Sequence, residues 1–389
     1  MEVIREHYLN LLRAGRDKYD TVKVLTGMRR SGKSTLLKQF ARTLPQDDNI
    51  IFLDLDFINE EMTWKQLSDK IRGGLIEGKK HYVFIDEIQD VKGWERVVAE
   101  LVARGDCDVY ITGSSSKMLS SELATKISGR YVEIEIMPFS FSEYLEFYPG
   151  DREERFSDFL RFGSLPITEP SRGEVFCNKQ LEDVFNTVIV KDVLRHIKGD
   201  DVNQLIAIAR FLFSNTGNET NIDNISKTLG ISSITVKKYV SEMLSAHLFH
   251  YSEKYDIVGM KLFQTNGKYY ATDIGVRRVA LRNQHNPDIS KPLENIVYNE
   301  LRRRGYEIHI GSIKSKEIDF VATKSGRVRY YQVTQTMAAE GTKEREHAPL
   351  LTVRDNYPKT ILTLDRFGLG SYDGIEVMNV IDWLLAPDS

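Results

Sequence analysis

The stretch Gly27-Met28-Arg29-Arg30-Ser31-Gly32-Lys33-Ser34 decides the fold of the N-terminal part of the chain. It fits the pattern G-x-x-x-x-G-K-[S/T] at every position. The segment Val22-Lys23-Val24-Leu25-Thr26 before it predicts a buried strand. The segment from Lys33 to about Thr43 predicts a helix, because its apolar residues recur on one helical face. Strand, glycine loop and helix in this order indicate a phosphate-binding loop.

The chemistry of this loop requires its residue types. Two glycines let the backbone turn so that its N–H groups converge on a phosphate, and the dipole of the following helix favours the same anion. The Lys33 ammonium would neutralise the β- and γ-phosphates, and the Ser34 hydroxyl would coordinate Mg²⁺. We therefore predict ATP and Mg²⁺ as ligands. The predicted nucleotide-binding residues of the loop are Gly27, Arg29, Arg30, Ser31, Gly32, Lys33, Ser34 and Thr35.

A second motif supplies two acidic residues. The apolar run Tyr82–Ile85 predicts a strand, and Asp86 and Glu87 follow at its C-terminal tip, the edge at which open α/β sheets bind ligands. We expect Asp86 to hold Mg²⁺ and Glu87 to polarise the attacking water, so that Lys33 and Glu87 are catalytic. The alternative is that the two carboxylates only cap the next helix.

Three further residues are candidates for this site. Thr112 and Ser114 follow the strand 109–112, and either they contact the γ-phosphate or they form the N-cap of a helix from Lys117 to Ala124. Arg130 precedes the strand 131–136. It is either an arginine finger that stabilises the transition state or a member of a surface ion pair.

The remaining pattern of residues 1–150 predicts the fold class. Apolar strands at 22–26, 50–54, 82–85, 109–112 and 131–136 alternate with helices at 33–43, 63–76 and 94–103. Strands that are apolar throughout indicate a parallel sheet with helices on both faces, and therefore an α/β fold of the P-loop NTPase type.

Residues 220–250 predict a helix-turn-helix. Apolar residues recur at helical spacing on both sides of Gly230-Ile231-Ser232, and the stretch 250–270 would supply a wing. The second helix offers only Lys237 and Lys238 to phosphates. The unit is therefore predicted to be a winged helix that contacts either DNA or a protein.

The C-terminal part carries the layout of a PD-(D/E)xK nuclease. Glu294 lies on a predicted helix, Asp319 lies on a strand, and the next strand ends Gln332-Val333-Thr334. An amide replaces the third metal ligand and the motif has no lysine, so we expect a nuclease-like fold without nuclease activity. The basic run 302–304 is either a nucleic-acid contact or a solvated helix end.

These motifs together resemble a family. The segments Thr26–Leu37, Phe84–Trp94, Ile111–Leu119 and Leu123–Tyr131 resemble prokaryotic AAA-type ATPases that pair an ATPase core with a C-terminal domain of unknown function. Lys268–Gly275, Leu293–Asn295 and Lys316–Phe320 also resemble that family. The resemblance covers nearly the whole chain. It implies an AAA-like core with strand order 5-1-4-3-2, a winged helix and a nuclease-like fold, and it favours Arg130 as a nucleotide-sensing arginine.

Length and composition limit the remaining functions. The 389 residues exceed one domain, and we expect an ATPase core at 1–150, a helical connector at 151–200, a winged helix at 201–285 and a nuclease-like domain at 286–389. A net charge of −3 excludes binding of nucleic acid by overall charge alone. Neither a signal peptide nor a membrane span is expected, which predicts a cytoplasmic protein.

Three functions follow from the sequence. The first is an ATPase switch that acts on a protein, on DNA or RNA, or on further copies of the chain. The second is a nucleic-acid-binding protein with an ATP-gated nuclease-like domain. The third is a chain that binds ATP as a structural ligand without turnover.

Overall fold

The computed structural model describes residues 2–56, 62–119, 127, 129–194, 201–282, 289–338 and 341–387. Contacts divide the chain into two compact units, Met1–Pro138 with Ser245–His247 and Phe139–Leu244 with Leu248–Ser389. The segment 139–150, which the sequence analysis grouped with the ATPase core, belongs to the second unit. The reason is aromatic packing, since the Phe141 ring lies 5.4 Å from that of Phe159 within that unit.

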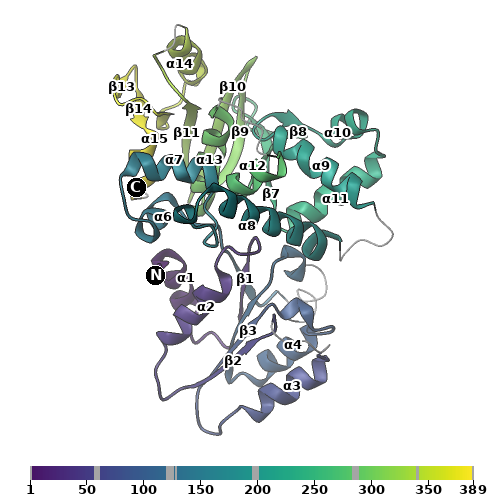
Figure 1. Cartoon of the computed structure of the whole chain (residues 1–389). Coiled ribbons are helices and arrows are strands. Elements are labelled where there is room, and N and C mark those ends of the chain that lie inside the picture. Colours follow the sequence, from purple (N-terminus) through teal and green to yellow (C-terminus); the bar gives the residue numbers. More distant parts are fainter. Residues whose placement is uncertain are drawn as a thin grey trace. The chain divides into compact units, whose positions relative to one another are not determined.

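The first unit is built on a five-stranded parallel sheet (Figure 1). Its strands are β1 (Val22–Thr26), β2 (Asn49–Asp54), β3 (His81–Asp86), β4 (Cys107–Thr112) and β5 (Tyr131–Glu135). Their order is β2-β3-β4-β1-β5, which confirms the predicted order 5-1-4-3-2. Strands β1, β3 and β4 are buried along their whole length, which explains why their sequences are mostly apolar. The charged side chains Lys23 of β1 and Asp108 of β4 are buried as an ion pair.

Helices cover both faces of this sheet (Figure 1). Helices α1 (Glu6–Gly15) and α2 (Lys33–Arg42) share one core with the strands. Helices α3 (Trp64–Gly73) and α4 (Glu95–Arg104) share a second core with them. Alternate residues of β1 serve the two cores, Val24 in one and Leu25 in the other. The described part of this unit also holds 3₁₀ turns at Ile88–Asp90 and Ser116–Leu119.

The second unit begins with helices. These are α6 (Phe141–Phe147), α7 (Arg152–Phe162), α8 (Glu174–Thr187) and α9 (Val202–Ser214), with a 3₁₀ turn at Pro170–Arg172 and a π-helical turn at Val188–Val193. Helices α10 (Ile222–Leu229) and α11 (Ser233–Ser245) follow, joined through Gly230 at φ 67°. Both helices and the glycine turn predicted at 222–244 are therefore present.

A nine-stranded sheet forms the rest of this unit, in the order β13-β14-β12-β11-β10-β9-β7-β8-β6. The strands are β6 (Glu219–Thr220), β7 (Phe249–Asp256), β8 (Lys261–Ala271), β9 (Glu307–Ile313), β10 (Lys316–Lys324), β11 (Arg327–Thr334), β12 (Lys359–Thr363), β13 (Gly370–Tyr372) and β14 (Ile375–Asn379). Its helices are α12 (Ile274–Ala280), α13 (Ser290–Arg303), α14 (Thr342–Thr352) and α15 (Val380–Leu385).

This sheet runs through the residues at which we expected a winged helix to end and a nuclease-like domain to begin. Strand β7 pairs in parallel with β9, with Lys254 opposite Ile310. The Asn295 side chain of α13 donates to the Ala271 carbonyl at 2.7 Å and accepts from the Ala271 N–H at 2.8 Å. The β7–β8 hairpin is therefore built into the same sheet as β9–β14.

Candidate functional site

The phosphate-binding loop has a backbone that only its glycines can adopt. Gly27 has φ 136°, and a Cβ there would lie 2.4 Å from the Ile136 carbonyl oxygen. Gly32 has φ 100° in the left-handed region and directly precedes α2. Arg30 also has a positive φ of 68°. The predicted loop thus turns tightly from β1 into the N-terminus of α2.

The polar groups of the loop suit a ligand rich in oxygen. Lys33 is 4% exposed, and its ammonium donates to the carbonyls of Gly27 at 3.0 Å and Met28 at 3.2 Å. The buried Ser31 Oγ has no hydrogen-bond partner within the described residues, a costly arrangement that a bound acceptor would relieve. Ser34 is half-buried and Thr35 is exposed in the first turn of α2. The residues present therefore fit a nucleoside triphosphate.

Asp86 and Glu87 lie at the same edge of the sheet as the loop. They end β3, and β4 lies between β3 and β1. Asp86 is 1% exposed and Glu87 7% exposed. Glu87 adopts the left-handed conformation, φ 54° and ψ 45°, which is uncommon for a residue with a side chain and typical of functional sites.

Thr112 joins the two acidic residues. Its hydroxyl donates to Asp86 Oδ1 and accepts from the Glu87 backbone N–H at 2.9 Å. Its register places it opposite Leu25, next to the end of β1. This bridging contact is a role that neither alternative of the sequence analysis included. A second contact comes from Gln89, whose amide donates to Glu87 Oε2.

The other two candidates have different positions. Ser114 is buried, just beyond β4. The helix expected from Lys117 to Ala124 extends outside the described residues, which stop at Leu119. Arg130 is exposed and precedes β5, where Tyr131 pairs with Val22 at the start of β1. Arg130 thus lies at the edge opposite the phosphate-binding loop, roughly 15–20 Å of extended strand away, so it cannot reach its own chain's loop.

In the second unit, the predicted metal ligand Glu294 pairs with a buried lysine. Lys268 of β8 is 2% exposed, and its ammonium donates to Glu294 Oε1 at 3.1 Å and to Glu317 Oε1 at 2.6 Å. Lys291 donates to the other oxygen of Glu294 at 3.0 Å. The motif Gln332-Val333-Thr334 has no lysine, as expected, but β8 brings Lys268 to Glu294 in the folded chain. The signal in the sequence is a lysine beside the apolar stretch Tyr269–Ala271.

The side chains of the remaining predicted ligands, Asp319 and Gln332, accept hydrogen bonds from backbone N–H groups of β10 and β11. Asp319 Oδ2 accepts from the Val333 N–H at 2.8 Å, and Gln332 Oε1 accepts from the Asp319 N–H at 3.2 Å. Among the described residues, no group of three or more His, Cys, Asp or Glu side chains could hold a metal ion. Glu294 and Asp319, which we expected in a nuclease-like site, therefore lie in a cluster of lysines and carboxylates.

Burial sets the protonation of this cluster. Desolvation and the neighbouring Glu294 charge raise the pKa of Asp319 to about 8. Burial alone would raise the pKa of Glu294, but the Lys268 and Lys291 charges outweigh it and lower that pKa. Asp319 is thus the carboxyl group of the cluster that holds its proton most strongly.

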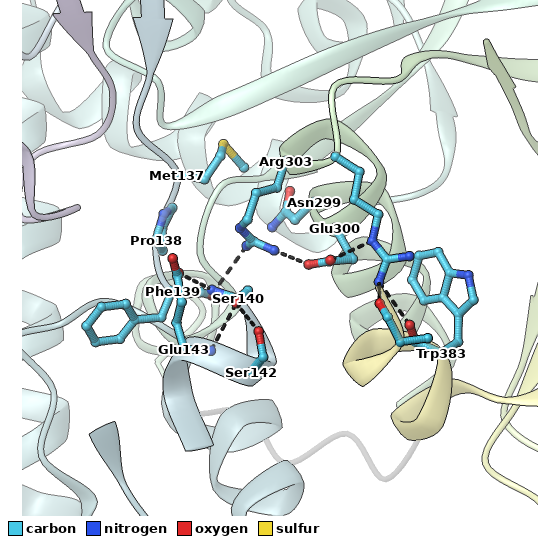
Figure 2. Close-up of polar contacts among 12 residues, drawn as sticks. Met137, Pro138, Phe139, Ser140, Ser142, Glu143, Asn299, Glu300, Arg303 and Trp383 are labelled. Atoms are coloured by element: carbon cyan, nitrogen blue, oxygen red, sulfur yellow. Dashed lines mark hydrogen bonds and ion pairs between the residues drawn. The ribbon is translucent and has the colours of Figure 1, made fainter. Parts of the chain in front are cut away.

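The basic run 302–304 is neither of the two alternatives that the sequence left open. Arg303 and Arg304 both pair with Glu300, and each side chain is only 10% exposed. Arg303 donates to the Phe139 carbonyl at 3.3 Å (Figure 2). Arg304 donates to the Trp383 carbonyl at 2.9 Å. Arg303 and Arg304 therefore make contacts inside the second unit. By contrast, Lys237 and Lys238 of α11 are exposed.

Comparisons with known proteins agree with the fold. The sequence profile of an AAA domain matches residues 19–145, and that of a domain of unknown function, DUF8612, matches residues 154–287. An uncharacterized protein of Haemophilus influenzae is 36% identical over 406 residues and covers 98% of both chains. An uncharacterized protein of Methanocaldococcus jannaschii is 26% identical, over 89% of this chain and 83% of the other.

Solved structures show only distant likeness. Cdc6p from Pyrobaculum aerophilum has a TM-score of 0.34 at 10% identity, over 76% of this chain and 94% of that one. The Aeropyrum pernix ORC1 protein in complex with DNA has a TM-score of 0.32 at 12% identity, over 73% and 93%. Scores this low carry no argument about ligands. In the described part of the chain no helix is long and apolar enough to cross a membrane.

Proposed function

Because the chain belongs to the family of AAA-domain proteins that includes its Haemophilus influenzae relative, we propose that it is a Mg²⁺-dependent ATPase that acts as a nucleotide-driven switch. The observation that carries this proposal is the Thr112 hydroxyl, which joins Asp86 to the backbone of Glu87. An arrangement that fixes both acidic residues beside a phosphate-binding loop serves hydrolysis as well as binding.

Each residue has one task in this proposal. Gly27 and Gly32 shape the loop, and the other loop residues from Arg29 to Thr35 contact the nucleotide. Lys33 neutralises charge on the phosphates. Ser34 and Asp86 hold Mg²⁺, which when bound supplies further positive charge against the phosphates.

Hydrolysis then depends on an acceptor for the proton of the attacking water. Glu87 accepts that proton, because its carboxylate is the acidic group that follows the metal-binding residue. The Thr112 hydroxyl fixes Glu87 by accepting from the Glu87 backbone N–H. Ser114 follows Thr112 by two residues, just beyond β4. Arg130 is exposed at the far edge of the sheet, so its proposed contact is with a nucleotide held by another copy of the chain.

Phosphate release by the purified chain with ATP and Mg²⁺ tests the proposal. Lys33→Ala should abolish hydrolysis and weaken binding. Glu87→Gln should keep binding and slow single-turnover hydrolysis by at least roughly tenfold, because an amide cannot accept the proton. Lys38→Ala, an exposed lysine of the same helix, is the matched control. Tight binding without phosphate release in the wild-type chain would leave ATP as a structural ligand.

The target of the switch is the second part of the proposal. We propose that the helices α10 and α11 form a winged helix with the β7–β8 hairpin. We propose that strands β9–β14 and α13 form a nuclease-like domain. A protein contact is favoured over DNA or RNA, because Arg303 and Arg304 are used internally. ATP turnover measured with and without single-stranded DNA, double-stranded DNA and RNA separates these partners.

The alternative function is ATP-gated cleavage of nucleic acid. Lys268 argues against it, because its ammonium already neutralises the carboxylate oxygens that a divalent ion would need. Mg²⁺-dependent cleavage by the wild-type chain would reverse this preference.

A further inference from the structure

We infer that Arg5 is a positioning residue of the nucleotide site, which couples the phosphate-binding loop to the segment 136–139 through which the chain enters the second unit. The inference rests on the proposed function and adds a route by which nucleotide binding is transmitted. Arg5 directly precedes α1 and belongs to none of the motifs of the sequence.

The contacts of Arg5 join two segments that are far apart in sequence. Its side chain is buried, with 4% exposed. Nη1 donates to the Ser31 carbonyl of the loop at 3.1 Å. Nη2 donates to the Met137 carbonyl at 2.9 Å and to the Pro138 carbonyl at 3.3 Å. The guanidinium lies 4.5 Å from the centre of the Tyr8 ring, which favours its charge.

The guanidinium makes these contacts dependent on one another. Its nitrogens lie in one rigid plane, so a shift of the partner of Nη1 requires Nη2 to follow or to lose its bond. Ser31 lies in the loop proposed to close around phosphates. A displacement of the Ser31 carbonyl when nucleotide binds is therefore carried to Met137 and Pro138.

The segment after β5 also contacts β1, the strand that precedes the phosphate-binding loop. The Ile136 N–H donates to the Thr26 carbonyl at 2.8 Å, and the Ile136 carbonyl is the group that a Cβ on Gly27 would strike. The Met137 N–H donates to the Tyr8 hydroxyl at 3.1 Å. Residues 136–138 are thus held by β1, by α1 and by Arg5.

The next peptide group, between Pro138 and Phe139, is bonded on both sides. Its carbonyl accepts from Arg5, and its N–H donates to the Ser164 carbonyl at 2.9 Å, within the second unit. Because a peptide group is planar, it cannot reorient at its carbonyl without doing so at its N–H. The Phe139 carbonyl in turn accepts from Arg303 (Figure 2).

Ser164 connects this peptide group to a helix of the second unit. Its N–H donates to Asp273 Oδ2 at 2.7 Å, and Asp273 Oδ1 caps α12 by accepting from the Val276 N–H at 2.9 Å. A Cβ on Gly163 would lie 2.3 Å from the Asp273 carboxylate, so this loop has no room to relax. A reoriented Phe139 N–H therefore acts on the start of α12.

Hydrogen–deuterium exchange of the full chain, with and without a non-hydrolysable ATP analogue and Mg²⁺, tests the inference. In the wild-type chain the analogue should change exchange in residues 139–164 and in α12. In Arg5→Ala the affinity for the analogue should fall by no more than about fivefold, while this nucleotide-dependent difference should shrink by at least about fivefold. Arg13→Ala, an exposed arginine of α1, should behave as the wild type.

Thermal melting would reveal whether Arg5→Ala fails to fold. In that case two milder variants test the inference. Arg5→Lys keeps the charge without the planar fork, so it should lose most of the exchange difference. Tyr8→Phe removes only the acceptor of the Met137 N–H and should reduce the difference less.

The outcomes separate the inference from the proposed function. A wild-type chain that does not bind the analogue would overturn the proposed function. Binding with no change of exchange in 139–164, or the full change in Arg5→Ala or Arg5→Lys, would overturn the role of Arg5 and leave the proposed function standing.

Discussion

Replacing Thr112 by valine removes one hydroxyl from the proposed site and little else. Valine has nearly the same shape and also favours a strand, so β4 should keep its packing. The change deletes the hydrogen bond to Asp86 Oδ1 and the acceptor of the Glu87 N–H. Both acidic residues then lose the group that fixes them relative to one another.

The size of the effect follows from burial. Thr112 is 0% exposed and Asp86 1% exposed, so water does not readily replace the lost partner. A buried N–H left without an acceptor costs about 1–3 kcal/mol, and we expect the first unit to lose about 2 kcal/mol of stability. Hydrolysis should fall further, by roughly ten- to a hundredfold, because a misplacement of about 1 Å in a catalytic group has that effect on rate.

The assay compares two quantities in three chains. ATP affinity and the single-turnover rate of phosphate release are measured for the wild type, Thr112→Val and Thr112→Ser. Thr112→Val should bind ATP within about threefold of the wild type while hydrolysing it slowly. Thr112→Ser retains the hydroxyl and should recover most of the rate.

Two results would refute this reasoning. A wild-type rate in Thr112→Val means that the hydroxyl does not position Glu87. An equal loss of rate in the serine and valine variants means that the methyl group, and therefore packing, is what matters. Thermal melting of each variant separates a lost active site from a lost fold.

Three other predictions concern the far edge of the sheet and the lysine–carboxylate cluster. Arg130→Ala should lower turnover with little loss of ATP affinity, and the wild-type rate per chain should rise with protein concentration. A wild-type rate in Arg130→Ala, together with a wild-type rate that does not depend on concentration, would mean that Arg130 has only a surface role. No cleavage of DNA or RNA is expected with Mg²⁺ or Mn²⁺, and cleavage that disappears in Asp319→Ala would contradict this. Because the folded pKa of Asp319 is raised to about 8, the folded chain holds a proton that the unfolded chain loses near pH 4, so this group's stabilisation falls as pH rises from about 4 to about 8. Asp319→Asn should therefore gain stability over the wild type as pH rises from 5 to 8 in urea unfolding, by up to about 1.4 kcal/mol for each pH unit, and a difference that does not depend on pH would disprove the shift.

The sequence by itself determined the nucleotide-binding half of the protein to a large extent. The glycine–lysine loop and the run Tyr82–Glu87 are local patterns, in which the chemistry of a few neighbouring residues fixes the backbone they adopt. The buried parallel strands could be predicted because both of their faces are covered, which makes them mostly apolar. The helices α10 and α11 could also be predicted from a local pattern, because apolar residues recur at helical spacing around Gly230.

The tertiary structure alone decided which distant residues meet. Strand register placed Arg130 at the edge of the sheet opposite the loop, although the sequence resemblance favoured a nucleotide contact. The pairing of β7 with β9 carried Lys268 into the carboxylate cluster, and no spacing in the sequence encodes such a pairing.

The same holds for charged residues that the fold uses internally. In the sequence, Arg303 and Arg304 suggest a basic surface. In the structure both pair with Glu300, and each side chain is only 10% exposed. Arg5 reads as an ordinary charge before a helix, yet it holds Ser31 and Met137 together. A buried charge needs partners from wherever the chain can supply them. Those partners are therefore set by the packing of the whole chain, which the local sequence pattern does not contain.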